Sequence, residues 1–596
     1  MLHWPKDRGL EGVEHSRCTI NKTPTRLKWM TCAQDSAVVW WERQLFSDVM
    51  FYPWMLVVER RAGLIAFLLL FAMAGLAFLS MRDDSATIDE VPHIIAGYSY
   101  LMKQDYRLNP EHPPLLKDLA ALPLVLMGLP FPDSSPYWEN DVNGQWGLGR
   151  VFLYGSGNDA DRILFWSRLP TVAMMLLLGI FLYKWSKERY GPKAELLALV
   201  LYSFSPTVLA HGRYVTIDMG IAALTFIAFY YFWRYLEKPT RLNFGLAVLS
   251  FTSAQLSKFP AVLLIPAFIL LIYLKGRSWR SLALLLLLSA VASTLFYQLH
   301  MLNMPLDVQH RLIETSISVE SGAYAQAVLL SLLHSMVDTV VLRAPAQYLL
   351  GLAMVGGHAV GGHTNYFLGA VGGHHWQYYI VAYLLKEPLA SQLLLLAAVW
   401  LTARRKMRPG DLSLGILSYC LLSLVVFSAF NTQLGIRYIL PLFPFIYLLT
   451  SGQIAKYKGV LKLGRPLLIA WLAVSSLLVF PSYLAYYNEL VGGPRNGYLY
   501  LVDSNADWGQ DLKRLAQFVD ENSISRIWVS YFGGGDPAYY LGEKYVPWEP
   551  AKGPVDGWFA VSESLYQSHR DDYSWLLGSQ PVAQIGYSIL VYNKTF

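Results

Sequence analysis

The chain has 596 residues, of which 54% are hydrophobic and 15% are charged. A charged fraction so far below the roughly 25% of soluble domains excludes a disordered, collagen-like or disulfide-rich secreted protein, and it favours an integral membrane protein. The net charge is +6, but the segment from 489 to the C-terminus has 8 Lys and Arg against 13 Asp and Glu, so this segment carries −5 and the rest +11. This asymmetry predicts basic cytoplasmic loops and an acidic domain outside, and it does not indicate nucleic-acid binding.

Residues 1–54 are polar, contain scattered tryptophans and have no hydrophobic periodicity. Two hypotheses account for this segment. It is either a cytoplasmic N-terminal extension with a regulatory role, or the product of a start codon assigned too far upstream, in which case Met50 or Met55 is the true first residue.

Residues 55–488 are predicted to form a mainly α-helical membrane domain of about eleven spans. The first predicted span, 62–81, has 20 residues without a charge, which is enough for the roughly 30 Å hydrocarbon core. Two further apolar stretches, 321–337 and 344–356, are predicted to be interfacial or re-entrant helices; if both span the membrane, the count is 13. The other ten predicted spans are 169–183, 196–210, 219–233, 242–257, 259–274, 281–304, 388–403, 412–436, 438–455 and 466–488.

The distribution of basic residues predicts the orientation of these spans. The five loops assigned to the cytoplasmic side hold 18 Lys and Arg, whereas the three short loops assigned to the outside hold only Arg213, Lys258 and Arg437. Cytoplasmic loops of membrane proteins carry such an excess of positive charge. With an odd number of spans and a cytoplasmic N-terminus, we expect the C-terminal domain to lie outside.

Three regions outside the spans are expected to be ordered. A long first outer loop, 82–165, is rich in Pro, Asp and aromatic residues, and an outer loop rich in His and Gly covers 305–385. Long ordered loops on a rigid scaffold usually carry function. The segment 489–596 is predicted to be a small α/β domain, with a helix over 511–522 and strands over 526–532, 558–562 and 585–592.

Polar side chains collect at the predicted outer ends of the spans, while the span interiors are nearly free of charge. Ten of the 13 histidines lie between 93 and 375, and none of these ten falls in a predicted inner loop. This pattern predicts one site at the outer face that combines carboxylates, histidines and isolated cations. The candidate carboxylates are Asp89, Glu90 and Asp218, and the candidate phosphate-binding cations are Arg213, Lys258, Lys386 and Arg437.

Each of these candidates has an ordinary structural alternative. Asp89 and Glu90 are also compatible with a solvated loop, and Arg213 and Arg437 with interfacial anchors whose side chains extend to lipid headgroups. If the segment near Thr87 is helical, adjacent residues diverge by about 100°, so only one of the two acids can face a cavity.

A divalent metal ion, zinc or manganese, is a further hypothesis, since carboxylate and imidazole groups suit both metals. The irregular spacing of the histidines matches no compact zinc motif, and the chain has no HExxH, P-loop or GxSxG sequence. The candidate metal ligands are Glu90, His93, His358, His363, His374 and His375.

Several segments resemble one group of membrane enzymes. The sequence IDEVPHIIAGYSYL (88–101) resembles the acidic motif in the first outer loop of GT-C glycosyltransferases, and GRYVTIDMGIAALTF (212–226) resembles their signature at the start of the fourth span. Further similar blocks are EHPPLLK (111–117), YFLG (366–369), WQYYIVAYLLKEPL (376–389), GIRYILPLFPF (435–445), YNELVGGPRNG (487–497) and DSNADWGQDLKRL (503–515). Within the GT-C superfamily, the chain is most similar to the dolichyl-phosphate-mannose protein mannosyltransferase-like and aminoarabinose-transferase-like enzymes.

This resemblance implies an inverting transfer of a sugar from a polyprenyl-phosphate carrier to an acceptor at the outer face of the bacterial inner membrane. It also implies that a carboxylate of the first outer loop, the first acid of the pair and hence Asp89, is the general base, and that cations hold the lipid phosphate. The sequence does not identify the sugar or the acceptor, which is a protein, a lipid or a glycan. The loop 356–375 contains more histidines than we expect for a loop of the protein mannosyltransferases.

Two alternatives to this function stay open at the level of sequence. The first is a transporter or flippase for a lipid-linked glycan, although such proteins place charges near the bilayer midplane and this chain does not. The second is a catalytically inactive relative of the GT-C enzymes that serves as an assembly scaffold.

Overall fold

The computed structural model describes residues 61–317, 324–404, 410–457 and 461–595. The chain divides into two units, Met1–Arg60 and Arg61–Phe596, and the described residues all belong to the second. The predicted extension 1–54 and the alternative start sites therefore lie outside the described residues.

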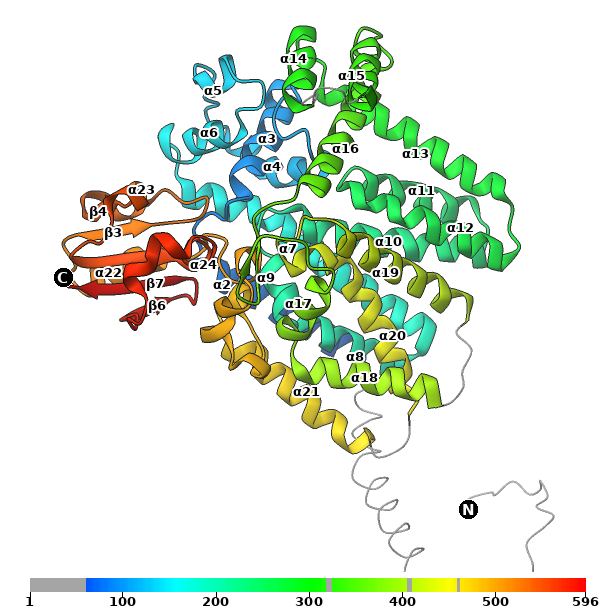
Figure 1. The fold of residues 1–596 in the computed structure, drawn as a ribbon. Helices are drawn as coiled ribbons and strands as arrows, with labels where there is room; N and C mark the ends of the chain where they lie inside the picture. The colour runs from blue at the N-terminus through cyan, green and yellow to red at the C-terminus, as the bar shows by residue number, and fades with distance from the viewer. Residues whose placement is uncertain (1–60, 318–323, 405–409, 458–460, 596) are drawn as a thin grey trace, which may run out of the picture. The chain divides into compact units, whose positions relative to one another are not determined.

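Helices dominate this unit (Figure 1). Within the described ranges, six helical segments are long and apolar enough to cross a membrane, and the bent pair α17 Tyr378–Lys386 and α18 Leu389–Arg404, with 117° between the two helices, counts as a seventh if it forms one span. These helices identify the chain as an integral membrane protein. The six are α2 Ala62–Met81, α7 Ala160–Tyr190, α10 Ile217–Glu237, α13 Trp279–His300, α19 Asp411–Ala429 and the segment Ile436–Ala455, which comprises η3 Ile436–Leu442 and α20 Phe443–Ala455.

All eleven predicted spans coincide with helices, but several are shorter than expected. The run 196–210 divides into α8 Pro192–Ser203 and α9 Pro206–His211, because Pro206 disfavours the helical conformation for the residue before it and begins a new helix. The runs 242–257 and 466–488 correspond to the shorter helices α11 Arg241–Gln255 and α21 Leu461–Leu478, whereas the run 259–274 is matched by Phe259–Lys275. The count of eleven spans stays a prediction.

The predicted first outer loop folds into short helices. These are α3 Glu90–Lys103, α4 Leu115–Met127, α5 Pro136–Glu139, α6 Gln145–Arg150 and the π-helical turn η1 Val151–Gly155. The predicted outer loop rich in His and Gly forms α14 Leu306–Ser316, α15 Tyr324–Val337, α16 Arg343–Gly361 and a two-stranded sheet of β1 Tyr366–Phe367 and β2 Ala370–Val371.

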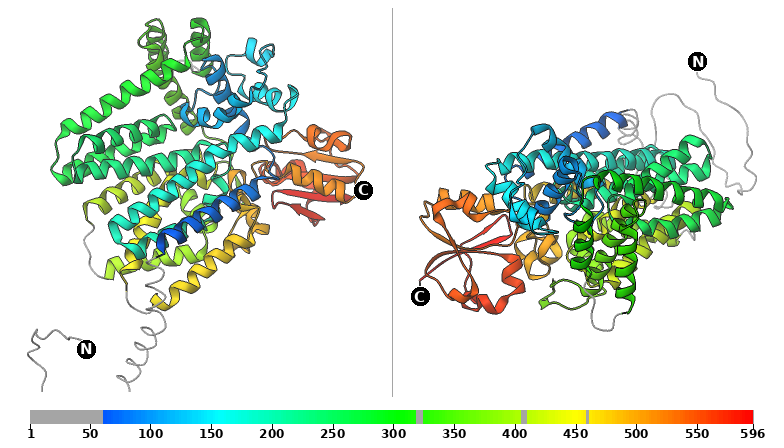
Figure 2. Two further views of the ribbon diagram at one scale, coloured as in Figure 1. Left: turned by 180° about the vertical axis from the view of Figure 1, so that it is seen from behind. Right: turned by 90° about the horizontal axis from the view of Figure 1, so that it is seen from above.

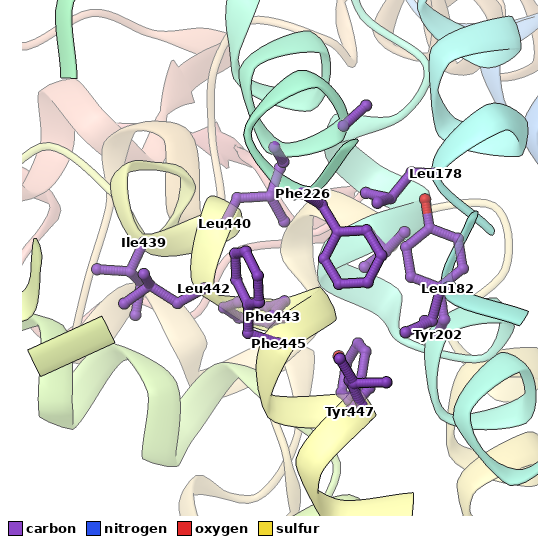
Figure 3. Close-up of a cluster of buried hydrophobic side chains, with 14 of the residues drawn as sticks. Leu178, Leu182, Tyr202, Phe226, Ile439, Leu440, Leu442, Phe443, Phe445 and Tyr447 are labelled. Carbon is purple, nitrogen blue, oxygen red and sulfur yellow. The ribbon is translucent and has the colours of Figure 1, made fainter. Parts of the chain in front are cut away.

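A buried hydrophobic cluster joins α7, α8, α10 and α20 (Figure 3). Phe226 of α10 packs against Phe445 of α20 with ring centroids 5.0 Å apart, and it packs against Trp185 of α7 at the same distance. Aromatic pairs at this separation stabilise a core beyond the area they bury. The cluster therefore fixes α10 against α20, and with them the residues at their neighbouring ends, Asp218 and Arg437.

The C-terminal domain contains a five-stranded mixed sheet in the order β4-β3-β5-β7-β6. β3 runs parallel to β4 and β5, and β7 is antiparallel to β5 and β6. One face of the sheet packs against α22 Leu512–Glu521 through a hydrophobic cluster; Figure 2 shows these elements in orange and red from two further directions. The strands are β3 Ile527–Ser530, β4 Tyr545–Pro547, β5 Gly557–Ser562, β6 Ala583–Ile585 and β7 Ile589–Lys594.

The predicted helix 511–522 and the strands 526–532 and 558–562 are confirmed within a few residues. The single strand predicted over 585–592 is wrong, because a turn separates β6 from β7 there. Gly586 and Tyr587 both have positive φ, 57° and 64°, which is typical of a tight hairpin connection. The short edge strand β4 had no signal in the hydrophobic pattern.

Candidate active site

Four charged residues from distant parts of the chain form one cluster, which we call the ion cluster: Asp89, Asp218, Lys258 and Arg437. Arg437 Nη1 lies 2.6 Å from Asp89 Oδ2 and 3.5 Å from Asp218 Oδ2. Lys258 Nζ lies 2.6 Å from the other oxygen, Oδ1, of Asp218. Sequence analysis predicted all four as site residues, and the fold brings them together.

Each member of the ion cluster lies at the start of a helical element or directly before one. Asp89 occupies the N-cap position of α3, and Asp218 lies in the first turn of α10, where the helix dipole favours negative charge. Lys258 is extended immediately before η2 Phe259–Leu263, and Arg437 is the second residue of η3. Because these elements begin at the same end of the bundle, four short segments supply the site.

The ion cluster is buried on one side and accessible on the other. The side chain of Asp218 is 1% exposed and that of Arg437 9%, whereas that of Asp89 is 24% exposed. The Arg437 guanidinium carbon lies 4.4 Å from the centre of the Trp508 ring, and Arg437 Nε has no hydrogen-bond partner among the described residues. The arginine is thus held in place while part of its hydrogen-bonding capacity is unused, and an anion can approach from the side of Asp89.

Arg213 and Lys386, also predicted to bind phosphate, have other partners in this structure. Arg213 is fully buried, with Nη2 3.1 Å from Asp84 Oδ2 and Nη1 donating to Pro481 O at 3.0 Å. Lys386 Nζ donates to the backbone carbonyls of Leu484, at 2.7 Å, and Asn505. Both cations hold backbone segments together in this structure, and their role as phosphate ligands stays a prediction.

Glu90, predicted as a catalytic residue and a metal ligand, is fully buried in a salt bridge with Arg168. Arg168 donates to both carboxylate oxygens, at 2.8 and 2.7 Å. The backbone N–H groups of Thr87 and Val215 donate to the same two oxygens, each at 2.9 Å. With its oxygens occupied in this way, Glu90 fixes the loop that carries Asp89, and its catalytic and metal-binding roles stay predictions.

The expected metal ligands are not assembled. In the part of the chain that the structure describes, no group of three or more His, Cys, Asp or Glu side chains is arranged to hold a metal ion. His93 Nδ1 lies 3.0 Å from Val215 O, His374 Nε2 lies 2.8 Å from Ser428 O, and His375 Nε2 lies 3.2 Å from Gly372 O. His358 and His363 are neighbours, with ring centroids 5.6 Å apart, but no carboxylate completes a ligand set with them in the described residues.

The histidines near the ion cluster are neutral at physiological pH. Burial lowers the pKa of His93, lowers that of His112 well below its usual value, and lowers that of His211 to about 3. These imidazoles therefore add no positive charge beside Arg437 and Lys258.

Sequence analysis missed two residues of this region. Arg168, which holds Glu90, directly precedes a predicted span, and an arginine at that position also suits an interfacial anchor. Asp503 interacts electrostatically with Arg437 and Asp89, and burial raises its pKa to about 6. The available signal for Asp503 was its place as the first acid of DSNADWGQD, a segment recognised only as the junction with the C-terminal domain.

Comparison with known proteins gives one match to a protein family. Residues 162–300 match the model of the family described as dolichyl-phosphate-mannose-protein mannosyltransferase. This segment contains Arg168, Arg213, Asp218 and Lys258. The predicted resemblance to the mannosyltransferase-like enzymes is thus confirmed over 162–300. The comparison with curated proteins gave no match.

Solved structures with a similar chain trace include two of ArnT from Cupriavidus metallidurans. The apo form has 12% identity and a TM-score of 0.45, with 89% of this chain and 98% of that chain covered. The form bound to undecaprenyl phosphate has 12% identity and a TM-score of 0.44, covering 88% and 97%. The oligosaccharyltransferase of Archaeoglobus fulgidus has 10% identity and a TM-score of 0.38, covering 86% and 70%.

Proposed function

We propose that the chain is a membrane glycosyltransferase that moves a sugar from a polyprenyl-phosphate carrier to an acceptor at the outer face of the bacterial inner membrane. The observation that carries this proposal is the ion cluster, in which two cations and a partly exposed carboxylate meet at one end of a helical bundle. The match of residues 162–300 to a mannosyltransferase family supports the same reaction class.

In this proposal, Arg437 and Lys258 bind the donor phosphate. Both cations are held in place within the protein, Arg437 against Trp508 and Lys258 5.0 Å from the ring centre of Tyr438. The phosphate gains negative charge as the bond to the sugar breaks, so cations placed beforehand stabilise the transition state more than the ground state. Arginine also offers two parallel donors to phosphate oxygens.

Asp89 is the proposed general base. A hydroxyl or amine of the acceptor attacks the anomeric carbon of the sugar, the bond from that carbon to the phosphate oxygen breaks, and the acceptor proton passes to the carboxylate of Asp89. The lipid phosphate leaves with the electron pair of the broken bond, and the configuration at the anomeric carbon inverts.

The contact between Asp89 and Arg437 requires a rearrangement during this reaction. An inverting displacement needs the base on the side of the sugar opposite the leaving phosphate, whereas here Asp89 contacts the arginine proposed to bind that phosphate. We propose that the donor phosphate replaces Asp89 as the partner of Arg437. The released carboxylate, which is already the most exposed member of the cluster, then turns toward the acceptor.

An apolar cavity of about 360 Å³ offers a place for part of the polyprenyl chain. It lies among α11, α12 Leu264–Lys275, α13 and α16, and its lining includes Gln255, three positions before Lys258. A lipid whose phosphate is bound at Lys258 can therefore extend along helices of the membrane domain.

Transfer by the purified full-length protein tests this proposal. The donors are undecaprenyl phosphate linked to radiolabelled glucose, mannose or aminoarabinose, and the acceptors are membranes from a strain that lacks the gene. We expect label to move from at least one donor into a membrane component, and Asp89→Asn to slow this transfer about 10²–10⁴-fold. If every donor stays intact while the protein moves labelled lipid across vesicle bilayers, the protein is a flippase and the proposal is wrong.

A further inference from the structure

A polar cavity of about 180 Å³ lies where the membrane domain meets the C-terminal domain. The membrane domain contributes the chain around β1 and the start of α17, and the C-terminal domain contributes the end of β3 and the helix α24 Glu563–Ser568. The volume is below the roughly 300–1,000 Å³ of pockets that enclose a whole drug-sized ligand. The cavity therefore suits a single ring-sized group that belongs to a larger molecule.

The lining of this junction cavity combines aromatic side chains with unused polar groups. Tyr366, Tyr378 and Phe532 are the aromatic residues. Asn365 Oδ1 is buried without a hydrogen-bond partner in the described residues, although the loss of hydrogen bonds to water makes such an atom costly to bury. Ser568 also lines the cavity and is half-buried.

Asp503 connects this cavity to the ion cluster. Its side chain lines the cavity and interacts electrostatically with Arg437 and Asp89. Its backbone N–H donates to Ser564 Oγ at 3.0 Å, and its φ of 59° lies in the left-handed region, which only local contacts make favourable for a residue other than glycine. The backbone of Asp503 is thus held at the cavity, while its carboxylate interacts electrostatically with two members of the ion cluster.

We infer that the junction cavity binds one ring of a carbohydrate acceptor, with aromatic faces against the ring and Asn365, Ser568 and Asp503 as hydrogen-bond partners of its hydroxyl groups. Flat apolar faces combined with a few fixed donors and acceptors suit a ring that has both C–H surfaces and hydroxyl groups. The inference rests on the proposed transferase function and names the chemical class of its acceptor. It also explains why the C-terminal domain borders the site, because this domain supplies part of the acceptor pocket.

Saturation-transfer NMR on the full-length protein in detergent tests the inference directly. The probes are the methyl glycosides of glucose, galactose and N-acetylglucosamine, with the tripeptide Gly-Thr-Gly for comparison. We expect saturation of at least one glycoside and no saturation of the peptide. Ser568→Trp, which fills the cavity, should weaken glycoside binding at least tenfold, whereas Ser574→Trp, at an exposed position of the same domain outside the lining, should leave it unchanged.

Thermal unfolding and binding of undecaprenyl phosphate show whether each variant is folded. If Ser568→Trp does not fold, Asn365→Ala, which removes the unpaired acceptor, carries the test and should weaken glycoside binding severalfold. The inference is overturned if no glycoside binds to the wild type, if the peptide binds instead, or if the folded cavity variant binds glycosides as the wild type does.

The outcome also separates this inference from the proposed function. A wild-type protein that transfers sugar from the lipid donor but binds no glycoside overturns the acceptor inference alone. A protein that binds glycosides in the cavity but never transfers sugar overturns the transferase proposal.

Discussion

Arg437 Nη1 lies 2.6 Å from Asp89 Oδ2, although 348 positions separate the two residues in the chain. The same nitrogen lies 3.5 Å from Asp218, which in turn pairs with Lys258. A carboxylate at the accessible edge and two cations behind it form a site in which an anionic ligand can displace Asp89 from Arg437.

Replacing Arg437 by alanine should impair both donor binding and chemistry. We expect the KM for the lipid donor to rise at least tenfold and kcat to fall about 10²–10³-fold, because the arginine is proposed to stabilise the charge that develops on the leaving phosphate. Steady-state kinetics with the labelled lipid donor measure both values. Arg213→Ala is the matched comparison. It should lower the unfolding temperature but leave the donor KM close to the wild-type value. Equal kinetic effects of the two variants would show that Arg437 has no special contact with the phosphate.

Arg168→Leu should destabilise the protein, because it leaves the carboxylate of Glu90 buried and unpaired. Removing one partner of a buried pair costs about 3–5 kcal/mol. Arg234→Leu is the control, since Arg234 and Glu188 form a pair with 35% and 39% exposed side chains, and such pairs contribute about 0–1 kcal/mol. Thermal unfolding in detergent compares the two variants. If both lower the midpoint equally, the pair between Arg168 and Glu90 does not hold the Asp89 loop.

Asp507 should make stability depend on pH. Burial raises the pKa of Asp507 to about 7 in the folded protein, above its ordinary value of 3.8, so the folded state holds a proton that the unfolded state releases between these values. Stability should therefore fall as pH rises from about 4 to about 7, by at most about 1.4 kcal/mol per pH unit from this group.

Asp507→Asn removes this titration, and its stability relative to the wild type should increase between pH 5 and pH 8. Unfolding midpoints of the two proteins at several pH values measure the difference. Asp520→Asn, on the exposed side of α22, is the control and should leave the wild-type pH dependence in place. A constant difference between Asp507→Asn and the wild type across this range would contradict the prediction.

The orientation of the chain is testable by labelling. In a chain whose three cysteines are replaced by serine, a cysteine at Ser523 should react with a membrane-impermeant reagent in intact spheroplasts, because the C-terminal domain is predicted to lie outside. A cysteine at Lys406, in a predicted cytoplasmic loop, should react only after lysis. The reverse labelling pattern would show that the orientation predicted from loop charge is wrong.

The members of the ion cluster were predictable because their positions relative to the apolar runs can be read from the sequence alone. Asp218, Lys258 and Arg437 are isolated charges at the predicted outer ends of apolar runs, and Asp89 belongs to an acidic pair in the predicted first outer loop. The pairing of these residues was not predictable, since hydrophobic periodicity locates helices but does not say which helix ends meet.

The sequence does not show which of the predicted site charges have partners inside the protein. Glu90 and Arg213 look like site residues in the sequence, because a charge that is neutralised inside the protein and one that faces a ligand occupy the same kind of position. Only the tertiary contacts of Glu90 with Arg168, and of Arg213 with Asp84, distinguish the two cases. Asp503 was missed for the converse reason, since it lies beyond the last apolar run, in a segment without periodicity.

The role of Asp89 is the central claim, and Asp89→Asn tests it most directly because asparagine keeps the size and polarity of the side chain but cannot accept the acceptor proton. The measurement is kcat with the lipid donor, together with donor binding as a check that the variant is folded. We predict that kcat falls about 10²–10⁴-fold while donor affinity stays the same or increases, since Arg437 loses its competing carboxylate partner. A folded variant that retains more than about a tenth of the wild-type kcat would contradict the account, because the loss of a general base costs far more than that.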